Sequence, residues 1–115
     1  MDNPVFWNAE KPYLYKLQVQ AGEETICFQI GFRDIAVSGL GELLINGVPV
    51  KLKGVNRHDT HPQLGWVTPY EFIKNELLKM KELNINCIRT SHYPPTPELL
   101  NLCDEIGFYI VDETD

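Results

Sequence analysis

Two polar blocks that stand one helix apart do most to limit the folds open to this 115-residue chain. Residues 54–59 read GVNRHD and residues 89–94 read RTSHYP, and each block follows an apolar run that is typical of a strand. The stretch between them is amphipathic, which predicts a helix. Parallel strands connected by a helix end on the same face of a sheet. The two blocks are therefore expected at one edge, where α/β folds keep their functional groups.

Both predicted helices have recognisable starts and apolar faces. Thr68 and Glu71 form a predicted capping box, with a proline at the first helical position, and the helix is expected to run to about residue 83. Its apolar face consists of Ile73, Leu77 and Met80. Thr96 opens a shorter helix that Gly107 ends. Its inward positions are predicted to be Leu99, Leu100, Cys103 and Ile106.

A third apolar run, residues 108–111, follows the second helix and leads into an acidic terminus. Nearly continuous apolar strands that alternate with amphipathic helices indicate a parallel sheet buried on both faces. Successive side chains on a strand point to opposite faces, so only one of Asp112 and Glu113 can point to the enclosed side. Three such strands do not complete a common α/β architecture. We therefore expect a segment of a larger protein, the alternative being a self-sufficient α+β domain.

The first third of the chain has a different, all-β pattern. Residues 13–19 and 25–32 alternate apolar and polar positions around a turn at 21–24, which predicts a hairpin. Short strands are expected at 35–37, 43–45 and 50–52, with an Asn46-Gly47 turn before the last. A lone hairpin is marginal in water, so this part needs more sheet or another surface to pack on.

Composition excludes several classes of protein. The net charge is −6 and no basic run occurs, which argues against a nucleic-acid partner. No apolar stretch approaches the roughly 18 residues of a membrane span, so we expect a soluble, cytoplasmic protein without a membrane partner. Cys27, Cys87 and Cys103 lack metal or redox spacing and are expected to be buried, reduced thiols.

Polar side chains gather at, or just beyond, the three predicted strand ends. They are Asn56, Arg57, His58, Asp59, His61, Arg89, Ser91, His92, Tyr93, Asp112, Glu113 and Asp115. Many hydrogen-bonding groups around one concave floor suit a polyhydroxylated ligand such as a sugar, because charged partners give strong, directional hydrogen bonds. A purely structural role for any single Arg or His remains open.

Other chemistries find less support in the sequence. His58, His61 and His92 could form a zinc set, but two of them lie in a predicted extended loop without a helical HExxH context. No nucleophile elbow, phosphate loop or dinucleotide fingerprint occurs. Acyl, phosphoryl and hydride transfer therefore lack their expected parts, and we predict no metal site within the chain.

Six motifs together resemble the family 2 glycoside hydrolases, in the family's order and over essentially the whole chain. They are WNAEKPYLY at 7–15, GFR at 31–33, NGVPV at 46–50, GVNRH at 54–58, RTSHYP at 89–94 and VDE at 111–113. The resemblance implies an α/β fold with a small all-β N-terminal part. Residues 1–35 would be the last strands of an immunoglobulin-like β-sandwich, and residues 36–115 the first three βα steps of an incomplete (β/α)8 TIM barrel.

The form of the first barrel motif bears on the substrate. Asn-Arg-His-Asp at 56–59, followed by a His-Pro pair, is more similar to β-galactosidases of this family than to β-glucuronidases, which tend to carry Lys at the Arg57 position. The resemblance implies that His58 and His92, with Asn56 and Asp59, bind the sugar, and that Arg89 positions the nucleophilic carboxylate. Members use a retaining mechanism with two glutamates roughly 5 Å apart. Neither is expected within these 115 residues, so the chain alone is predicted to be inactive.

The resemblance also bears on cofactors and partners. Magnesium and sodium would belong to the longer parent protein, and no cofactor is expected in this chain. The expected ligand is a galactoside. Open strand edges predict self-association. A β-glucuronidase or other family 2 glycosidase, and a non-catalytic carbohydrate-binding or structural module, are the alternatives.

Overall fold

The computed structural model describes residues 2–114 and divides into two compact units, residues 1–50 and 51–115. Each unit is described by itself. Asp115, one of the polar residues expected at the strand ends, lies outside the described residues. Within the described part of the chain, no helix is both long enough and apolar enough to cross a membrane.

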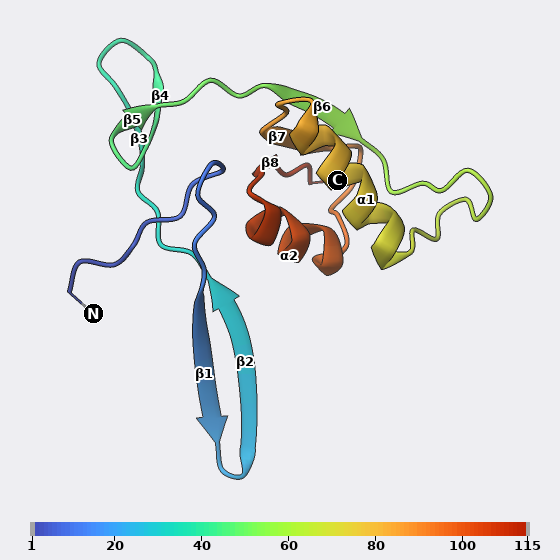
Figure 1. Ribbon diagram of the computed structural model, residues 1–115, viewed down its shortest axis with the longest axis horizontal. Coiled ribbons are helices and arrows are strands. Elements are labelled where there is room, and N and C mark those ends of the chain that lie inside the picture. Colours follow the sequence, from blue (N-terminus) through green and yellow to red (C-terminus); the bar gives the residue numbers. More distant parts are fainter. Residues whose placement is uncertain (1, 115) are drawn as a thin grey trace. The chain divides into compact units, whose positions relative to one another are not determined.

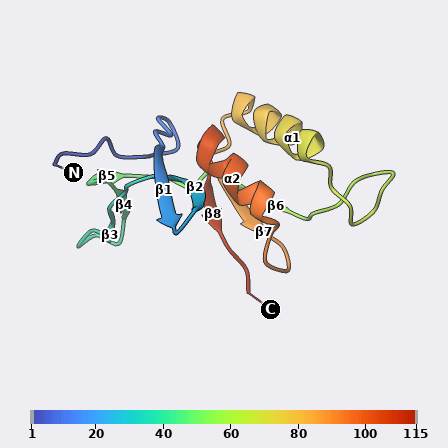
Figure 2. The same ribbon diagram turned by 90° about the horizontal axis from the view of Figure 1, so that it is seen from below.

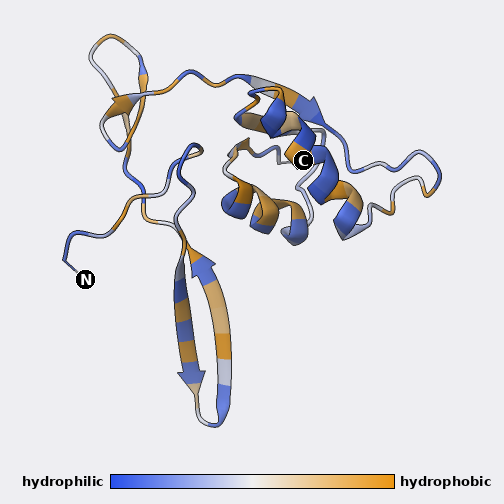
Figure 3. Cartoon of the chain, viewed as in Figure 1, coloured by the Kyte–Doolittle hydropathy of each residue, from blue (hydrophilic) through white to orange (hydrophobic). Residues whose placement is uncertain are grey.

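An antiparallel hairpin in the first unit matches the predicted pair of strands. It consists of β1 (Tyr15–Ala21) and β2 (Glu24–Ile30), joined by a turn in which Gly22 has a φ of 63°. The register places apolar residues opposite each other on one face, as in the pair Leu17 and Phe28. Figure 3 shows the alternation of apolar and polar residues along β1. Both faces of this hairpin are largely exposed within the described chain.

A buried tryptophan organises the segment before and after this hairpin. Trp7 is 1% exposed, its backbone N–H donates to the Phe32 carbonyl oxygen at 2.7 Å, and the Arg33 guanidinium lies 5.2 Å from the centre of its ring. The Asn46 side-chain amide donates to the Trp7 carbonyl oxygen at 3.0 Å, and its Oδ1 accepts from the Asp34 N–H at 2.9 Å. Residues far apart in the sequence are thus joined around one side chain.

A second small sheet completes this unit with strands β3 (Ile35–Val37), β4 (Leu43–Ile45) and β5 (Val48–Pro49), all antiparallel. Asn46 and Gly47 both have positive φ, which is the conformation that a tight hairpin turn requires. The predicted turn is therefore confirmed. The prediction of a strand at 50–52 is wrong, because the two-residue turn brings Val48 directly opposite Ile45 and pairing begins at once.

The second unit is the predicted alternation of strands and helices (Figures 1 and 2). Its elements are β6 (Gly54–Arg57), α1 (Tyr70–Glu82), β7 (Cys87–Thr90), α2 (Pro97–Ile106) and β8 (Tyr109–Val111). The strands form one parallel sheet in the order β6-β7-β8. Their carboxyl ends therefore meet at one edge, as the sequence predicts.

The core of this unit lies between the sheet and the two helices. Its buried members are Ile73, Leu77, Ile88, Leu99, Leu102, Cys103 and Phe108, with Met80 packed against them. The predicted apolar face of α1 is confirmed. In α2 the buried leucines are Leu99, as predicted, and Leu102, whereas Leu100, which we expected inside, is only half-buried. Leu100 and Leu102 are two residues apart, which on a helix turns a side chain to the opposite face.

The helix ends follow the predictions except at the start of α1. Gly107 ends α2 in the left-handed conformation, with a φ of 94°. Pro69, in extended conformation, is the N-cap of α1, and no side chain caps it. The predicted capping box is therefore wrong. The Thr68 hydroxyl, one residue too early, is buried without a hydrogen-bond partner.

The three cysteines are free thiols in two different settings. Cys87 and Cys103 are buried, as predicted. Cys27 is exposed, which contradicts the prediction. Cys27 lies on β2 of the hairpin, both faces of which are largely exposed within the described chain, and the register sets it opposite Gln18.

Candidate functional site: polar side chains at the carboxyl ends of three parallel strands

The strand register sorts the polar side chains at this edge onto two faces of the sheet. Asn56 pairs with Arg89, and Arg57 pairs with Thr90. Ile88 is completely buried in the core against the helices. Because side chains alternate along a strand, Arg57 and Thr90 share the helix-facing side with Ile88, whereas Asn56 and Arg89 point to the other side.

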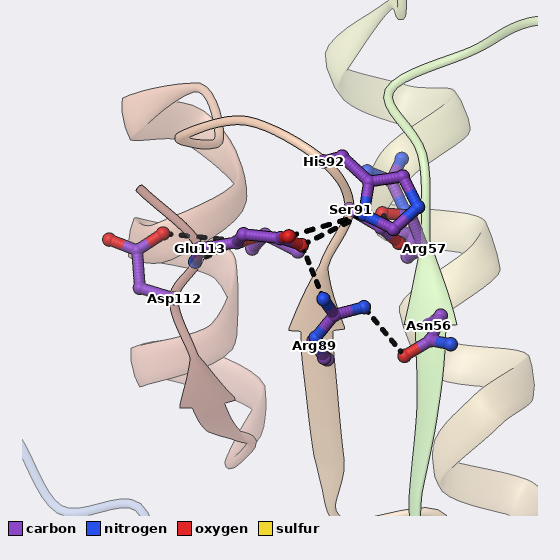
Figure 4. A network of polar contacts seen from close by, with 8 residues as sticks. Asn56, Arg57, Arg89, Ser91, His92, Asp112 and Glu113 are labelled. Carbon is purple, nitrogen blue, oxygen red and sulfur yellow. Dashed lines mark hydrogen bonds and ion pairs between the residues drawn. The ribbon is translucent and has the colours of Figure 1, made fainter. Parts of the chain in front are cut away.

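The face that points away from the helices carries a connected set of four residues, here called the strand-end cluster: Asn56, Arg89, His92 and Glu113. Arg89 Nη2 lies 2.7 Å from Glu113 Oε2, and His92 Nδ1 lies 3.2 and 3.1 Å from the two oxygens of the same carboxylate. Arg89 Nη1 makes a long contact of 3.5 Å with Asn56 Oδ1. Figure 4 shows the Glu113 carboxylate directed at both Arg89 and His92. Three strand ends thus contribute to one cluster.

Glu113 is held in this orientation by its backbone. The Thr90 hydroxyl, on a residue 3% exposed, accepts from the Glu113 N–H at 2.9 Å and donates to Asp112 Oδ1 at 3.1 Å. The Asp112 carboxylate therefore bonds to Thr90, while the Glu113 carboxylate reaches the strand-end cluster. Figure 4 shows the Asp112 and Glu113 side chains directed to different sides. The prediction that these two adjacent carboxylates point in different directions is confirmed.

His58 and His92, the two predicted sugar-binding imidazoles, lie side by side. Their ring centres are 5.4 Å apart and their planes are inclined by 72°. The ring of Tyr93 lies 6.3 Å from that of His58. Both imidazoles are exposed, so each can offer a ring nitrogen to a ligand.

Arg57 and Asp59, by contrast, are buried and pair with each other. Arg57 Nη1 donates to Asp59 Oδ1, and Arg57 Nη2 lies 2.9 Å from Glu76 Oε2 on α1. The Asp59 N–H donates to the Tyr93 hydroxyl at 2.9 Å, and the Ser91 hydroxyl donates to the Arg57 carbonyl oxygen at 3.3 Å. These contacts fasten the segment that carries His58 to α1 and to the end of β7.

The sequence-based interpretation gave Asp59 a different role and did not include Glu76 or Thr90 in the site. A direct sugar contact by Asp59 stays a prediction, since in the structure its carboxylate accepts from Arg57 instead. Glu76 and Thr90 were not singled out, although both hold the site in place. Alternation along β7, applied outward from the apolar Ile88, would have identified the helix-facing direction of Thr90.

The three histidines do not come together as a metal set. The His61 ring packs on Phe72, with 4.5 Å between ring centres, and its Nδ1 accepts the backbone N–H of Gln63 at 3.2 Å. Among residues 2–114, no group of three or more His, Cys, Asp or Glu side chains could hold a metal ion.

The cluster is suited to binding rather than to proton transfer between paired carboxylates. Its exposed ion pairs contribute about 0–1 kcal/mol each to stability, since solvent screens them. Their main effect is therefore to orient the imidazole and guanidinium groups. Donors and acceptors that converge from three strand ends can discriminate the hydroxyl groups of a ligand.

Comparison with known proteins places this geometry in a family. Residues 35–115 match the family model described as "Glycosyl hydrolases family 2, TIM barrel domain". The chain is 49% identical over 109 residues to a β-galactosidase of Actinobacillus pleuropneumoniae, and 39% identical over 118 residues to that of Kluyveromyces lactis. These alignments cover 95% and 97% of the chain but only 11% of each relative, so the chain spans about a tenth of their length.

Solved structures of the same family superpose closely on this chain. A β-galacturonidase of Eisenbergiella tayi superposes with a TM-score of 0.89 at 36% identity, covering 96% of this chain and 20% of that one. A β-glucuronidase of Parabacteroides merdae superposes with a TM-score of 0.89 at 30% identity, covering 99% of this chain and 15% of that one. The chain belongs to the glycosyl hydrolases of family 2, with part of their TIM barrel domain, and is most like the β-galactosidases of that family.

Proposed function

We propose that this chain is part of a retaining β-galactosidase that hydrolyses terminal β-D-galactosides such as lactose, and that it forms one side of the sugar pocket. The convergence of Asn56, Arg89, His92 and Glu113 at three parallel strand ends is the observation that carries the proposal. The identity to curated β-galactosidases supports this choice of substrate.

The proposed roles follow the arrangement of the site. His58 and His92 bind galactosyl hydroxyl groups through exposed ring nitrogens, and Asn56 lies on the same face. Arg89 orients the nucleophilic carboxylate supplied by another segment of the protein. Asp59 contributes by fixing Arg57 and the segment that carries His58, in addition to the predicted sugar contact.

We further propose that the chain by itself does not catalyse the reaction. A retaining glycosidase needs a nucleophile and an acid/base about 5 Å apart, and the family resemblance assigns both to segments outside these residues. In the proposed domain division, residues 1–35 are the last strands of an immunoglobulin-like domain. Residues 36–115 begin the barrel of a cytoplasmic enzyme, and any magnesium or sodium binds elsewhere.

A hybrid enzyme tests this proposal. The matching segment of the Actinobacillus pleuropneumoniae β-galactosidase is replaced by this chain, and hydrolysis of nitrophenyl β-galactoside is measured beside the isolated chain. We expect the hybrid to retain activity within about tenfold of the parent, and the isolated chain to show none. A folded hybrid without activity would contradict the galactosidase assignment, and turnover by the isolated chain would contradict its predicted inactivity.

β-Glucuronidase is the second candidate, because several of the similar solved structures are named β-glucuronidases. Lys at the Arg57 position is typical of the glucuronidases, but here Arg57 points toward α1 and pairs with Glu76. Any influence of this residue on substrate choice therefore acts through the segment that carries His58. Nitrophenyl β-glucuronide, assayed with the same hybrid, distinguishes the two: preferential turnover of the glucuronide would replace the galactosidase proposal.

A further inference from the structure

We propose that Glu113 is a positioning residue that sets the tautomer of His92 and the orientation of Arg89. Its effect on catalysis rests on the proposed function, but its effect on His92 does not. Glu113 stands at the end of β8, whereas Arg89 and His92 lie on and just after β7. The carboxylate therefore couples two neighbouring strand ends.

The Glu113 carboxylate contacts Arg89 and His92 at the same time. Oε2 lies 2.7 Å from Arg89 Nη2 and 3.1 Å from His92 Nδ1, while Oε1 lies 3.2 Å from the same ring nitrogen. The Glu113 side chain is 26% exposed, less than that of Arg89 (38%) or His92 (65%). The least exposed of these three side chains is thus the one that contacts the other two.

The chemistry of the carboxylate decides which imidazole nitrogen carries the proton. An ionised carboxylate only accepts hydrogen bonds, so His92 Nδ1 must be protonated to bond with it, whether the ring is neutral or cationic. The other nitrogen, Nε2, is then the one presented to a ligand. In the neutral ring Nε2 is an acceptor, and it therefore receives a hydrogen bond from a sugar hydroxyl.

Glu113 does not depend on its two partners for its own position. Its backbone N–H is anchored to the buried Thr90 hydroxyl, which Asp112 holds from the other side. Loss of the Glu113 carboxylate therefore leaves the strand end in place. Asp112 provides a matched control, because it is the adjacent acidic residue and contacts Thr90 rather than Arg89 or His92.

The test measures the tautomers of the three histidines by ¹⁵N NMR on the 115-residue chain, at a pH of about 8.5 where an ordinary imidazole is neutral. We expect His92 to be protonated on Nδ1. His61, whose Nδ1 accepts the Gln63 and Leu64 N–H groups, is expected to be protonated on Nε2 and serves as an internal reference. Glu113→Ala should release His92 to a mixture of tautomers, whereas Asp112→Ala should not. An Nε2-protonated His92 in the unmodified chain, or no change in a folded Glu113→Ala variant, would overturn the proposal.

Glu113→Gln is a second variant that retains the shape but replaces the carboxylate with a neutral amide, which can donate as well as accept a hydrogen bond. It should weaken the preference of His92 for the Nδ1-protonated tautomer and free the Arg89 guanidinium, whose side-chain signals should come to resemble those of a mobile arginine. Unchanged Arg89 signals would contradict the orienting role, and retained core amide signals, such as that of Ile88, report that the variant is folded.

Kinetics in the hybrid enzyme separate this proposal from the proposed function. Glu113→Ala should lower kcat/KM for the galactoside by about tenfold or more, as expected for the loss of hydrogen bonds to charged groups, while Glu82→Ala, an exposed acidic residue at the end of α1, remains near the unmodified hybrid. An inactive hybrid with the expected His92 tautomer would refute the galactosidase assignment and leave the positioning role supported. An active hybrid that is indifferent to Glu113→Ala would refute the catalytic importance of Glu113.

Discussion

Gly31 is the residue whose missing side chain makes room for the buried Trp7. A Cβ atom at this position would lie 2.8 Å from Trp7 Cβ and 2.9 Å from Trp7 Cγ. We therefore expect Gly31→Ala to lower the free energy of unfolding by about 1–3 kcal/mol, as overpacking does. Gly39→Ala is the control, since nothing lies within 4 Å of a Cβ there. Denaturant unfolding followed at the Trp7 indole signal measures both, and equal stabilities would contradict the expectation.

The burial of Cys103 makes the stability of the fold depend on pH in the alkaline range. Burial, and secondarily the neighbouring Asp104, raises the pKa of the Cys103 thiol from 9.0 to about 12. A raised pKa in the folded state means that the protonated thiol stabilises the fold below pH 9, and that this contribution is lost as the pH rises from 9 to about 12. Cys103→Ala should therefore show a weaker loss of stability over this interval than the unmodified chain. Parallel curves of unfolding free energy against pH would show that Cys103 contributes nothing to it.

At the scale of elements, α1 is attached to the sheet by one apolar face. Leu77 is completely buried, whereas the next residue, Leu78, is 43% exposed. Leu77→Ala should therefore cost about 2–5 kcal/mol of unfolding free energy, because it leaves a cavity in the core. Leu78→Ala makes the same chemical change on the same helix and should cost well under half of that. Thermal or urea unfolding compares the two, and similar losses would mean that α1 is not packed on Leu77.

The elements of the second unit could be predicted closely from apolar periodicity. Both helices and all three strands lie where the pattern indicates, because that signal is local. The N-terminal cap of α1 could not be predicted in this way, since whether the Thr68 hydroxyl reaches a free N–H depends on the backbone conformation at Pro69. The direction of Arg57 was missed for a related reason. A polar residue at a strand end gives no hydrophobic signal that would assign its side chain to one face of the sheet. Only the pairing of Arg57 with Thr90 and its contact with Glu76 show that it faces the helices.

At the scale of the whole molecule, the described chain leaves apolar surface and strand edges open. In the sheet order β6-β7-β8, both outer strands have one side unpaired within the described residues, and such edges favour association. The hairpin also exposes an apolar face that includes Ile26 (52%) and Phe28 (49%). We therefore expect the isolated chain to self-associate, with sedimentation velocity showing larger species as concentration rises.

Two lysine substitutions on the hairpin distinguish these surfaces. Ile26→Lys places a charge on the apolar face and should reduce the association, whereas Gln18→Lys adds the same charge to the polar face and should not. Association that is unchanged by either variant would assign it to the sheet edges. A compact monomer at all concentrations would contradict the expectation altogether.

The sequence by itself determined the order of strands and helices, the shared edge of the two polar blocks and the family resemblance, because periodicity and motifs are properties of neighbouring residues. Only the tertiary structure decided which polar groups meet. It pairs Arg57 with Asp59 and Glu76 under α1, and joins Arg89 and His92 through Glu113. Except for the pair of Arg57 and Asp59, these contacts link residues about 20 positions apart, and they depend on the register of parallel strands and the face that each side chain takes, which no local pattern specifies.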